Sequence, residues 1–195
     1  RVSLSHRGRG GARAGARAAP GARAGGGRPP PAPGRGCAVE ELTMVEALTD
    51  DRQRLLALNE IYLGAPGHQT ARYRIGPDDP AANAEAQASS GVLVGTGTGA
   101  TGWLRSLWEQ RTGSPALPDR VDARLVWFVR EAWPSPVTGT SLVAGELSGA
   151  GRLRITVESD RLVAFGDGME GDALDLTWGQ SVSVGVSDTA LRLVG

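Results

Sequence analysis

The sequence predicts a mainly β domain, an antiparallel sandwich with one main helix. From residue 39 onward, short apolar runs are separated by turn residues at intervals of roughly 8–12 residues. Strands of a parallel α/β fold would instead alternate with helices. Only residues 103–110 repeat their apolar side chains at helical spacing, so this segment is the one main helix that we expect.

The expected strands follow from apolar runs and from the alternation of apolar and polar residues. In chain order they are residues 42–47, 55–63, 68–75, 90–94, 125–129, 142–147, 153–157, 162–165, 174–178, 182–186 and 191–194. Trp127 and Trp178 fall inside apolar strands, so we expect both indole rings in the core.

Charge is divided unevenly along the chain, although its formal net charge is zero. Residues 1–36 carry eight arginines and no acidic residue. Ordering the backbone of one residue costs roughly 1–2 kcal/mol, and this segment has too few apolar side chains to offset that cost. We therefore expect a disordered tail over residues 1–37 and one domain over residues 38–195.

Three interpretations of this tail stay open. An RNA-binding arm would need aromatic residues or repeated RGG units, and a transit peptide would need an amphipathic apolar face. The tail has none of these features. The interpretation that we favour is an inert linker or a misread translation of GC-rich DNA.

The composition excludes several classes of protein. Cys37 is the only cysteine, and His6 and His68 are the only histidines, so neither a disulfide framework nor a Cys- or His-based metal site is expected. No apolar run approaches the roughly 18 residues of a membrane span. We expect a cytoplasmic domain with no metal site, no membrane contact and no nucleic-acid partner.

The most specific local feature is the loop Gly95–Gly99, in which Gly and Thr alternate between an expected strand and the expected helix. Glycines allow a ligand to approach the backbone, and a helix N-terminus favours a phosphate. Gly97, Gly99 and Gly102 also match G-x-G-x-x-G, but antiparallel-type strands and the lack of a following acidic residue argue against a Rossmann fold. A connection that binds no ligand stays open as the alternative.

Two motifs then follow each other in a characteristic order. Asn59-Glu60 lies in L-A-L-N-E-I-Y-L-G, and S-G-V-L-V-G-T-G-T-G-A-T-G-W follows from Ser90 to Trp103. With T-M-V-E-A (residues 43–47) and F-G-D-G-M-E (residues 165–170), this order resembles the C-terminal domain of the NAD kinases over about residues 39–195. The loop is most similar to that of the mitochondrial-type NAD kinases and their bacterial relatives.

The resemblance implies the antiparallel β-sandwich of the NAD kinase C-terminal domain and ATP-dependent phosphorylation of NAD at the 2′-hydroxyl of its adenosine ribose. It also implies ATP and Mg²⁺ as phosphate donor and metal, and a homo-oligomer. Asn59 and Glu60 match the pair that contacts the ribose, and Trp103 stands where the family has a base-stacking tyrosine. The positions implied to bind NAD are Asn59, Glu60, Thr96, Thr98, Gly99, Ala100, Thr101 and Trp103.

The sequence also departs from the family pattern. Ser90 replaces an aspartate and Gly97 replaces a proline, which leaves open whether NAD or another nucleotide-like diol is the substrate. The family's Gly-Gly-Asp-Gly loop, whose aspartate takes the proton of the 2′-hydroxyl, does not occur in this sequence. We therefore assign no catalytic residue and expect a truncated chain that is inactive alone. The alternative is a non-catalytic nucleotide-binding or oligomerisation β-domain.

Two further groups of charged residues are interpreted as surface features. The acids between Asp167 and Asp175 do not have the spacing of a calcium loop, and we expect them to be solvated in a strand turn. Arg72 and Arg74 share one face of an expected strand, which we interpret as exposed.

Overall fold

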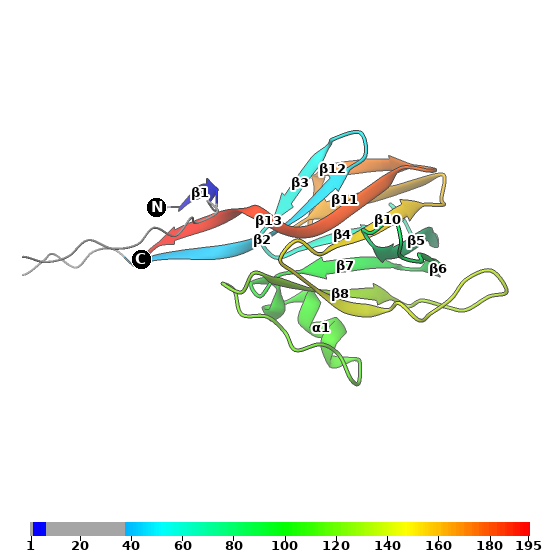
Figure 1. Ribbon diagram of the computed structural model, residues 1–195, viewed down its shortest axis with the longest axis horizontal. Helices are drawn as coiled ribbons and strands as arrows, with labels where there is room; N and C mark the ends of the chain where they lie inside the picture. Colours follow the sequence, from blue (N-terminus) through cyan, green and yellow to red (C-terminus); the bar gives the residue numbers. More distant parts are fainter. Residues whose placement is uncertain (1, 7–37) are drawn as a thin grey trace, which may run out of the picture.

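The computed structural model describes residues 2–6 and 38–195, which form two antiparallel sheets packed face to face (Figure 1). Sheet A has seven strands and sheet B has six. Sheet A consists of β1 (Val2–His6), β2 (Val39–Thr49), β3 (Arg54–Ala57), β5 (Ala71–Pro77), β6 (Glu85–Ser89), β10 (Arg152–Val157) and β13 (Ser181–Val194). Sheet B consists of β4 (Glu60–Gly64), β7 (Gly91–Gly95), β8 (Arg124–Arg130), β9 (Ala144–Ser148), β11 (Arg161–Gly166) and β12 (Met169–Thr177). The predicted mainly β, antiparallel architecture is confirmed.

The strands do not follow chain order within either sheet. Sheet A has the order β3-β2-β13-β10-β5-β6, with β1 paired to β13, and sheet B has the order β12-β11-β4-β7-β8-β9. The chain therefore crosses repeatedly from one sheet to the other, for example between β3 and β4 and between β9 and β10. In Figure 1 the long strands β2 and β13 extend beyond the other strands, with β1 beside β13.

The main core lies between the sheets and consists of the side chains that alternate inward along each strand. Fully buried examples are Tyr73 and Ile155 from sheet A and Leu125 and Leu162 from sheet B. Tyr73 brings a hydroxyl into this core, where it lies 2.6 Å from the Ser89 hydroxyl, so the buried polar atom has a partner.

A second, smaller core covers the outer face of sheet B. The helix α1 (Trp103–Glu109) and the short 3₁₀ helix η1 (Gly99–Thr101) pack there, with Leu104 and Leu107 against Leu93 and Phe128. Figure 1 shows α1 beyond β7 and β8, on the side away from sheet A. The structure confirms the expected helix, which ends at Glu109. Among the described residues, no helix is long and apolar enough to cross a membrane.

Several expected strands have different bounds in the structure. The expected strand 55–63 is two strands, because the chain leaves sheet A at Leu58 and Asn59 before it enters sheet B. The expected strands 182–186 and 191–194 are one strand, β13, interrupted by a bulge between Val186 and Ala190. Strand β6 was not expected, because its alanine-rich sequence has no strong apolar signal.

Two further expectations are wrong. The disordered tail predicted over residues 1–37 does not hold at Val2–His6, which pair with β13 as strand β1, whereas residues 1 and 7–37 lie outside the described part of the chain. Trp178 was expected in the core but is 67% exposed, because it lies in the tight turn between β12 and β13. Trp127, by contrast, is buried as expected.

Candidate functional site

The Asn59-Glu60 pair lies where the chain passes from sheet A to sheet B. The backbone N–H groups of Leu58 and Asn59 have no strand partner at this crossing. They donate instead to a side chain from the turn between β11 and β12. The carboxylate of Asp167 accepts hydrogen bonds from the N–H groups of Leu58 at 2.9 Å and Asn59 at 2.6 Å. The Asp167 N–H donates in return to the Glu60 carbonyl at 3.0 Å. The crossing is thereby held in one conformation.

The Gly-Thr loop packs directly on this crossing. The Thr96 N–H donates to the Asn59 carbonyl at 2.8 Å, and the Thr96 hydroxyl donates to the Leu58 carbonyl at 2.6 Å. The same hydroxyl accepts from the N–H groups of Thr98 and Gly99 at 3.1 and 3.4 Å. Thr96 is buried, and its hydroxyl joins the two motifs.

Two glycines of the loop are required by close approach of other backbone segments. A Cβ atom at Gly99 would lie 2.4 Å from the Asn59 carbonyl oxygen and 2.9 Å from Oε2 of Glu60. A Cβ atom at Gly97 would lie 2.2 Å from the backbone of Asp119. The structure therefore brings the Asn59-Glu60 pair and the loop into contact, although Thr96 lies thirty-six positions after Glu60 in the sequence.

Glu60 is the charged group of this arrangement. Its carboxyl is half-buried, and burial raises its pKa above the ordinary value, with a smaller contribution from the negative charge of Asp167. A carboxylate of raised pKa in such a place is a strong acceptor for a hydroxyl group.

The remaining predicted residues lie along the loop and the helix that follows. Ala100 is buried against α1, and Thr101 is exposed with its hydroxyl on the Thr98 carbonyl at 3.2 Å. The Thr98 hydroxyl is buried and has no hydrogen-bond partner among the described residues. Trp103 begins α1 and is partly exposed.

Trp103 belongs to an aromatic cluster on the outer face of sheet B. Its ring stacks on Tyr62 with a centroid distance of 5.3 Å and an interplanar angle of 25°. Phe165 contacts the same Tyr62 ring at 5.1 Å, and the guanidinium of Arg130 lies 5.4 Å from the Trp103 centroid. Nε of Arg130 is buried without a partner among the described residues. This group of aromatic and cationic side chains is suited to a planar, anionic ligand.

A cavity of about 610 Å³ opens beside this cluster. It lies within the range of roughly 300–1,000 Å³ that is usual for ligand pockets. Its lining side chains include Tyr62, His68, Trp103, Arg130, Arg161 and Phe165. Glu60 does not line the cavity, but it is two residues from Tyr62 on β4, so both side chains project from the outer face of sheet B. The arrangement thus combines a hydroxyl acceptor, a glycine-rich backbone, aromatic rings and guanidinium groups on one face.

Sequence reasoning did not identify Tyr62, Arg130 and Phe165. The alternation along β4 was a signal for Tyr62, because it places this residue on the face of Glu60. Asp167 was interpreted as a solvated turn acid, which is wrong, since both of its carboxylate oxygens accept backbone hydrogen bonds. Among the described residues there is no group of three or more His, Cys, Asp or Glu side chains that could hold a metal ion.

Comparisons with known proteins show a similarity of fold but no similarity of sequence family. No family model and no curated protein matches this sequence. Among solved structures, the fold is similar to that of yeast NADH kinase complexed with NADH, with a TM-score of 0.62 and 17% sequence identity. The similarity covers 82% of this chain and 45% of the kinase, so the chain spans less than half of that enzyme. The described chain therefore has an NAD kinase-like fold, that of the C-terminal β domain.

Proposed function

We propose that this chain binds NAD on the outer face of sheet B, as the dinucleotide-binding part of an NAD kinase. The observation that carries the proposal is the contact between the Asn59-Glu60 pair and the loop Gly95–Gly99, two motifs distant in sequence. The similarity in fold to a kinase complexed with NADH supports it.

Each part of a dinucleotide has a suitable partner at this site. Glu60 accepts a hydrogen bond from a ribose hydroxyl, and the glycines of the loop hold the loop against Asn59 and Glu60 at this place. The exposed surface of Trp103 offers a stacking surface for the base. The guanidinium of Arg130 lines the cavity and is partly exposed, so it can donate to a phosphate oxygen of the pyrophosphate. Of the eight residues that the family motif implies, the proposal gives direct contacts to Glu60 and Trp103, while Asn59, Thr96 and Gly99 hold the two motifs together, and it adds Arg130.

The test is a calorimetric titration of the purified chain with NAD. Glu60→Ala removes one hydrogen bond to a charged acceptor, worth about 1.5–3 kcal/mol, so we expect NAD affinity to fall by roughly 10–150-fold. Glu109→Ala is the matched control, because Glu109 is an exposed glutamate at the end of α1 that pairs with Arg105, whereas Glu60 is half-buried beside the loop. Unchanged NAD affinity in a folded Glu60→Ala variant would remove the proposal's main support.

We further propose that this chain binds NAD without phosphorylating it. The 195-residue sequence contains no Gly-Gly-Asp-Gly, the motif that the family resemblance implies for the acceptor base. A general base contributes roughly 10²–10⁴-fold in rate. With ATP and Mg²⁺ supplied, a coupled assay of NADP formation should show no turnover. A rate near the ~1–100 s⁻¹ of ordinary kinases would contradict this.

The intact enzyme of this proposal is a cytoplasmic homo-oligomer that takes its phosphoryl group from ATP with Mg²⁺. The described residues offer no carboxylate cluster for the metal, so no step here is assigned to it. The work of this chain is to hold the ribose hydroxyl through Glu60 and to orient the base through Trp103. The alternative, a non-catalytic nucleotide-binding domain, would also bind NAD in this titration. The kinase proposal differs from it in one outcome: adding a catalytic domain should restore turnover.

A further inference from the structure

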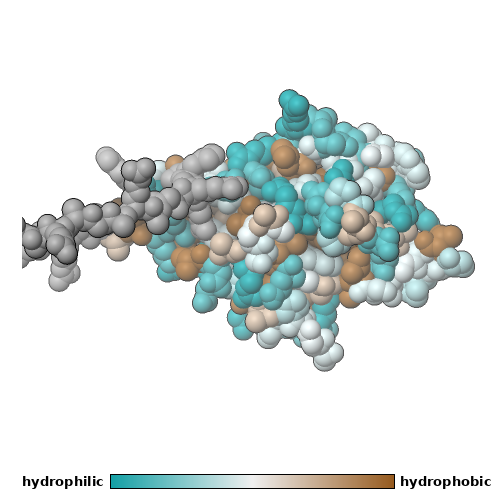
Figure 2. Space-filling model, in the orientation of Figure 1, coloured by the Kyte–Doolittle hydropathy of each residue, from teal (hydrophilic) through white to brown (hydrophobic). Residues whose placement is uncertain are grey.

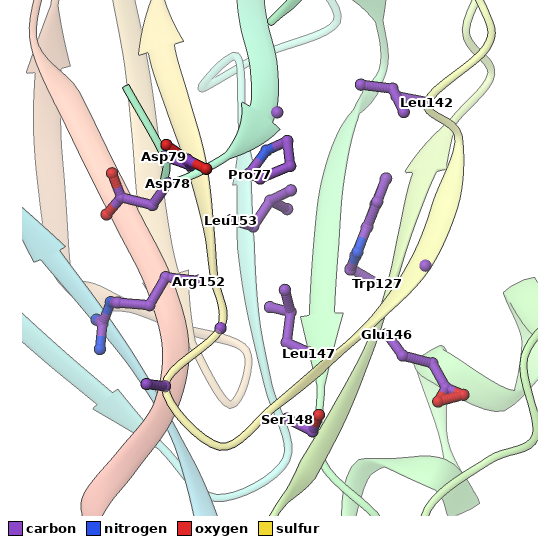
Figure 3. A pocket seen from close by; sticks show the side chains of 14 residues that line it. Pro77, Asp78, Asp79, Trp127, Leu142, Glu146, Leu147, Ser148, Arg152 and Leu153 are labelled. Atoms are coloured by element: carbon purple, nitrogen blue, oxygen red, sulfur yellow. The ribbon is translucent and has the colours of Figure 1, made fainter. Parts of the chain in front are cut away.

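A second cavity, of about 450 Å³, lies between the two sheets and shares no lining residue with the candidate dinucleotide site (Figure 3). It lies between the ends of β5 and β10 in sheet A and of β8 and β9 in sheet B. Its lining is mainly apolar, and the larger apolar side chains are Pro77, Trp127, Leu142, Leu147 and Leu153. Trp127 and Phe128 are neighbours on β8 and point to opposite faces, so sheet B separates the two sites.

Small residues keep this cavity open. The connection from β9 to β10 is the short turn Gly149–Ala150–Gly151, which brings no large side chain to the mouth. Gly145 on β9 leaves room for the indole of Trp127, since a Cβ atom there would lie 2.7 Å from its Nε1. The indole can lie against the backbone of β9 only because residue 145 is a glycine.

The indole N–H of Trp127 is a hydrogen-bond donor within this mainly apolar lining. Trp127 is only 6% exposed, and among the described residues no acceptor receives a hydrogen bond from its indole N–H. In Figure 3 the indole stands beside Leu147 and faces Leu153 across the cavity. Nε1 of Trp127 is not one of the buried side-chain atoms without a partner, so this donor is open to the cavity that the residue lines.

Four charged residues line the rim, of which Asp79 is exposed and accepts the Ala81 N–H at 2.9 Å, while the other three form ion pairs within the chain. Glu146 pairs with Arg124 at 3.1 Å, and Asp78 pairs with Arg154 at 2.9 Å. Arg152 pairs with Glu46 at 3.3 Å, and Figure 3 shows its side chain pointing away from Trp127. A ligand in this cavity therefore gains nothing from a charge of its own, and a charged group would have to lose its hydration.

We propose that this cavity is a second ligand site, which takes a small neutral molecule with an apolar body and one carbonyl group. The apolar body fills the space between Leu147 and Leu153, and the carbonyl accepts the hydrogen bond of the Trp127 N–H. Its volume lies in the usual range for small-molecule pockets, roughly 300–1,000 Å³. On the face shown in Figure 2, hydrophobic residues form separate patches among hydrophilic ones.

The experiment is a fluorescence titration of the full chain with the neutral naphthyl ketone propionyl-dimethylaminonaphthalene. We expect saturable binding with emission shifted to shorter wavelength as the probe leaves water. Trp127→Phe keeps an aromatic ring and removes the donor, so affinity should fall by about 2–12-fold. The corresponding ethyl-substituted naphthalene, which lacks the carbonyl, should bind the native chain and this variant equally.

A second variant tests the place of binding. Ala150 lies exposed on the turn that lines the mouth, so Ala150→Trp should block the cavity without disturbing the core and abolish saturable binding. Trp133→Phe is the control, since Trp133 is exposed outside the cavity and should change nothing. The proposal is overturned if the native chain shows no saturable binding, or if Ala150→Trp binds the ketone as the native chain does. If Ala150→Trp abolishes binding but Trp127→Phe binds the ketone as the native chain does, the proposed hydrogen bond from Trp127 to a carbonyl is excluded.

Discussion

The outer faces of the two sheets differ although both sheets are antiparallel and share one core. On sheet A the outer face is polar and carries ion pairs such as Arg54 with Glu46 at 2.5 Å and Arg154 with Asp78 at 2.9 Å. On sheet B the outer face carries Leu93 and Phe128, which α1 and η1 cover. This difference indicates which outer face can hold a ligand site. Water covers one face, whereas on the other the short helix leaves an uncovered margin beside Trp103.

The burial patterns along the strands show the same difference between the two sheets. All five residues of β7 are buried, and the five central residues of β8 are buried as well, so these strands need cover on both faces. Strand β5 instead alternates buried and exposed residues, as a strand with one solvated face does. The continuous apolar run therefore marks the sheet that carries the candidate site.

The largest effect should follow from removing the helical cover. Leu104 is fully buried under sheet B, so Leu104→Ala should lower the free energy of unfolding by about 2–5 kcal/mol. The matched change on the outer face of sheet A, Arg154→Ala, removes an exposed ion pair and should cost at most about 1 kcal/mol. Urea denaturation measures both. Equal costs would show that the two outer faces do not differ in the way described.

The next largest effect concerns the crossing between the sheets. Asp167→Ala leaves two backbone N–H groups without their acceptor and should destabilise the domain by about 1.5–3 kcal/mol. Asp172→Ala, in the same segment but exposed, should change stability by no more than about 0.5 kcal/mol. A small effect at Asp167 would mean that water replaces the carboxylate, and that the crossing is not held by this side chain.

Aromatic residues on the two outer faces offer a comparison in binding. Trp103→Ala should weaken NAD binding by roughly 5–150-fold, because stacking of one base is worth about 1–3 kcal/mol. Trp178→Ala changes an exposed tryptophan at the turn between β12 and β13, away from this cavity, and should leave NAD affinity unchanged. Calorimetric titration of both folded variants with NAD measures the two affinities. An equal loss in the two variants would point to nonspecific stacking.

The smallest effect should appear in the pH dependence of stability. Burial and the charge of Asp167 raise the pKa of Glu60 in the folded state above its unfolded value. The folded state then binds the proton more tightly, so the stabilisation is complete below the unfolded pKa and is lost as pH rises through the folded pKa. Glu60→Gln should therefore be slightly more stable than the native chain at pH 7, while it binds NAD more weakly. In thermal melts between pH 4 and pH 7, the variant should lose less stability than the native chain as the pH rises. Identical pH profiles would contradict a raised pKa of Glu60.

Local sequence determined much of this protein. Strand spacing and the apolar pattern of residues 103–110 predict the two-sheet architecture and α1, because periodicity records which face of an element is buried. The Gly-Thr loop became a candidate through its residue types, because a flexible backbone lets a ligand approach. Asn59 and Glu60 became candidates through the resemblance of the two motifs to those of the NAD kinases.

Contacts between residues distant in sequence are visible only in the tertiary structure. The hydrogen bonds of Asp167 to Leu58 and Asn59 join residues more than one hundred positions apart, and no local pattern encodes them. Trp127 and Trp178 lie in similar apolar sequences, yet one is buried and the other is exposed, since a strand and a turn place equal side chains differently. The stacking of Trp103 on Tyr62 likewise depends on how α1 docks on sheet B. Periodicity fixes the faces of elements, whereas contacts between elements arise only when the sheets pack.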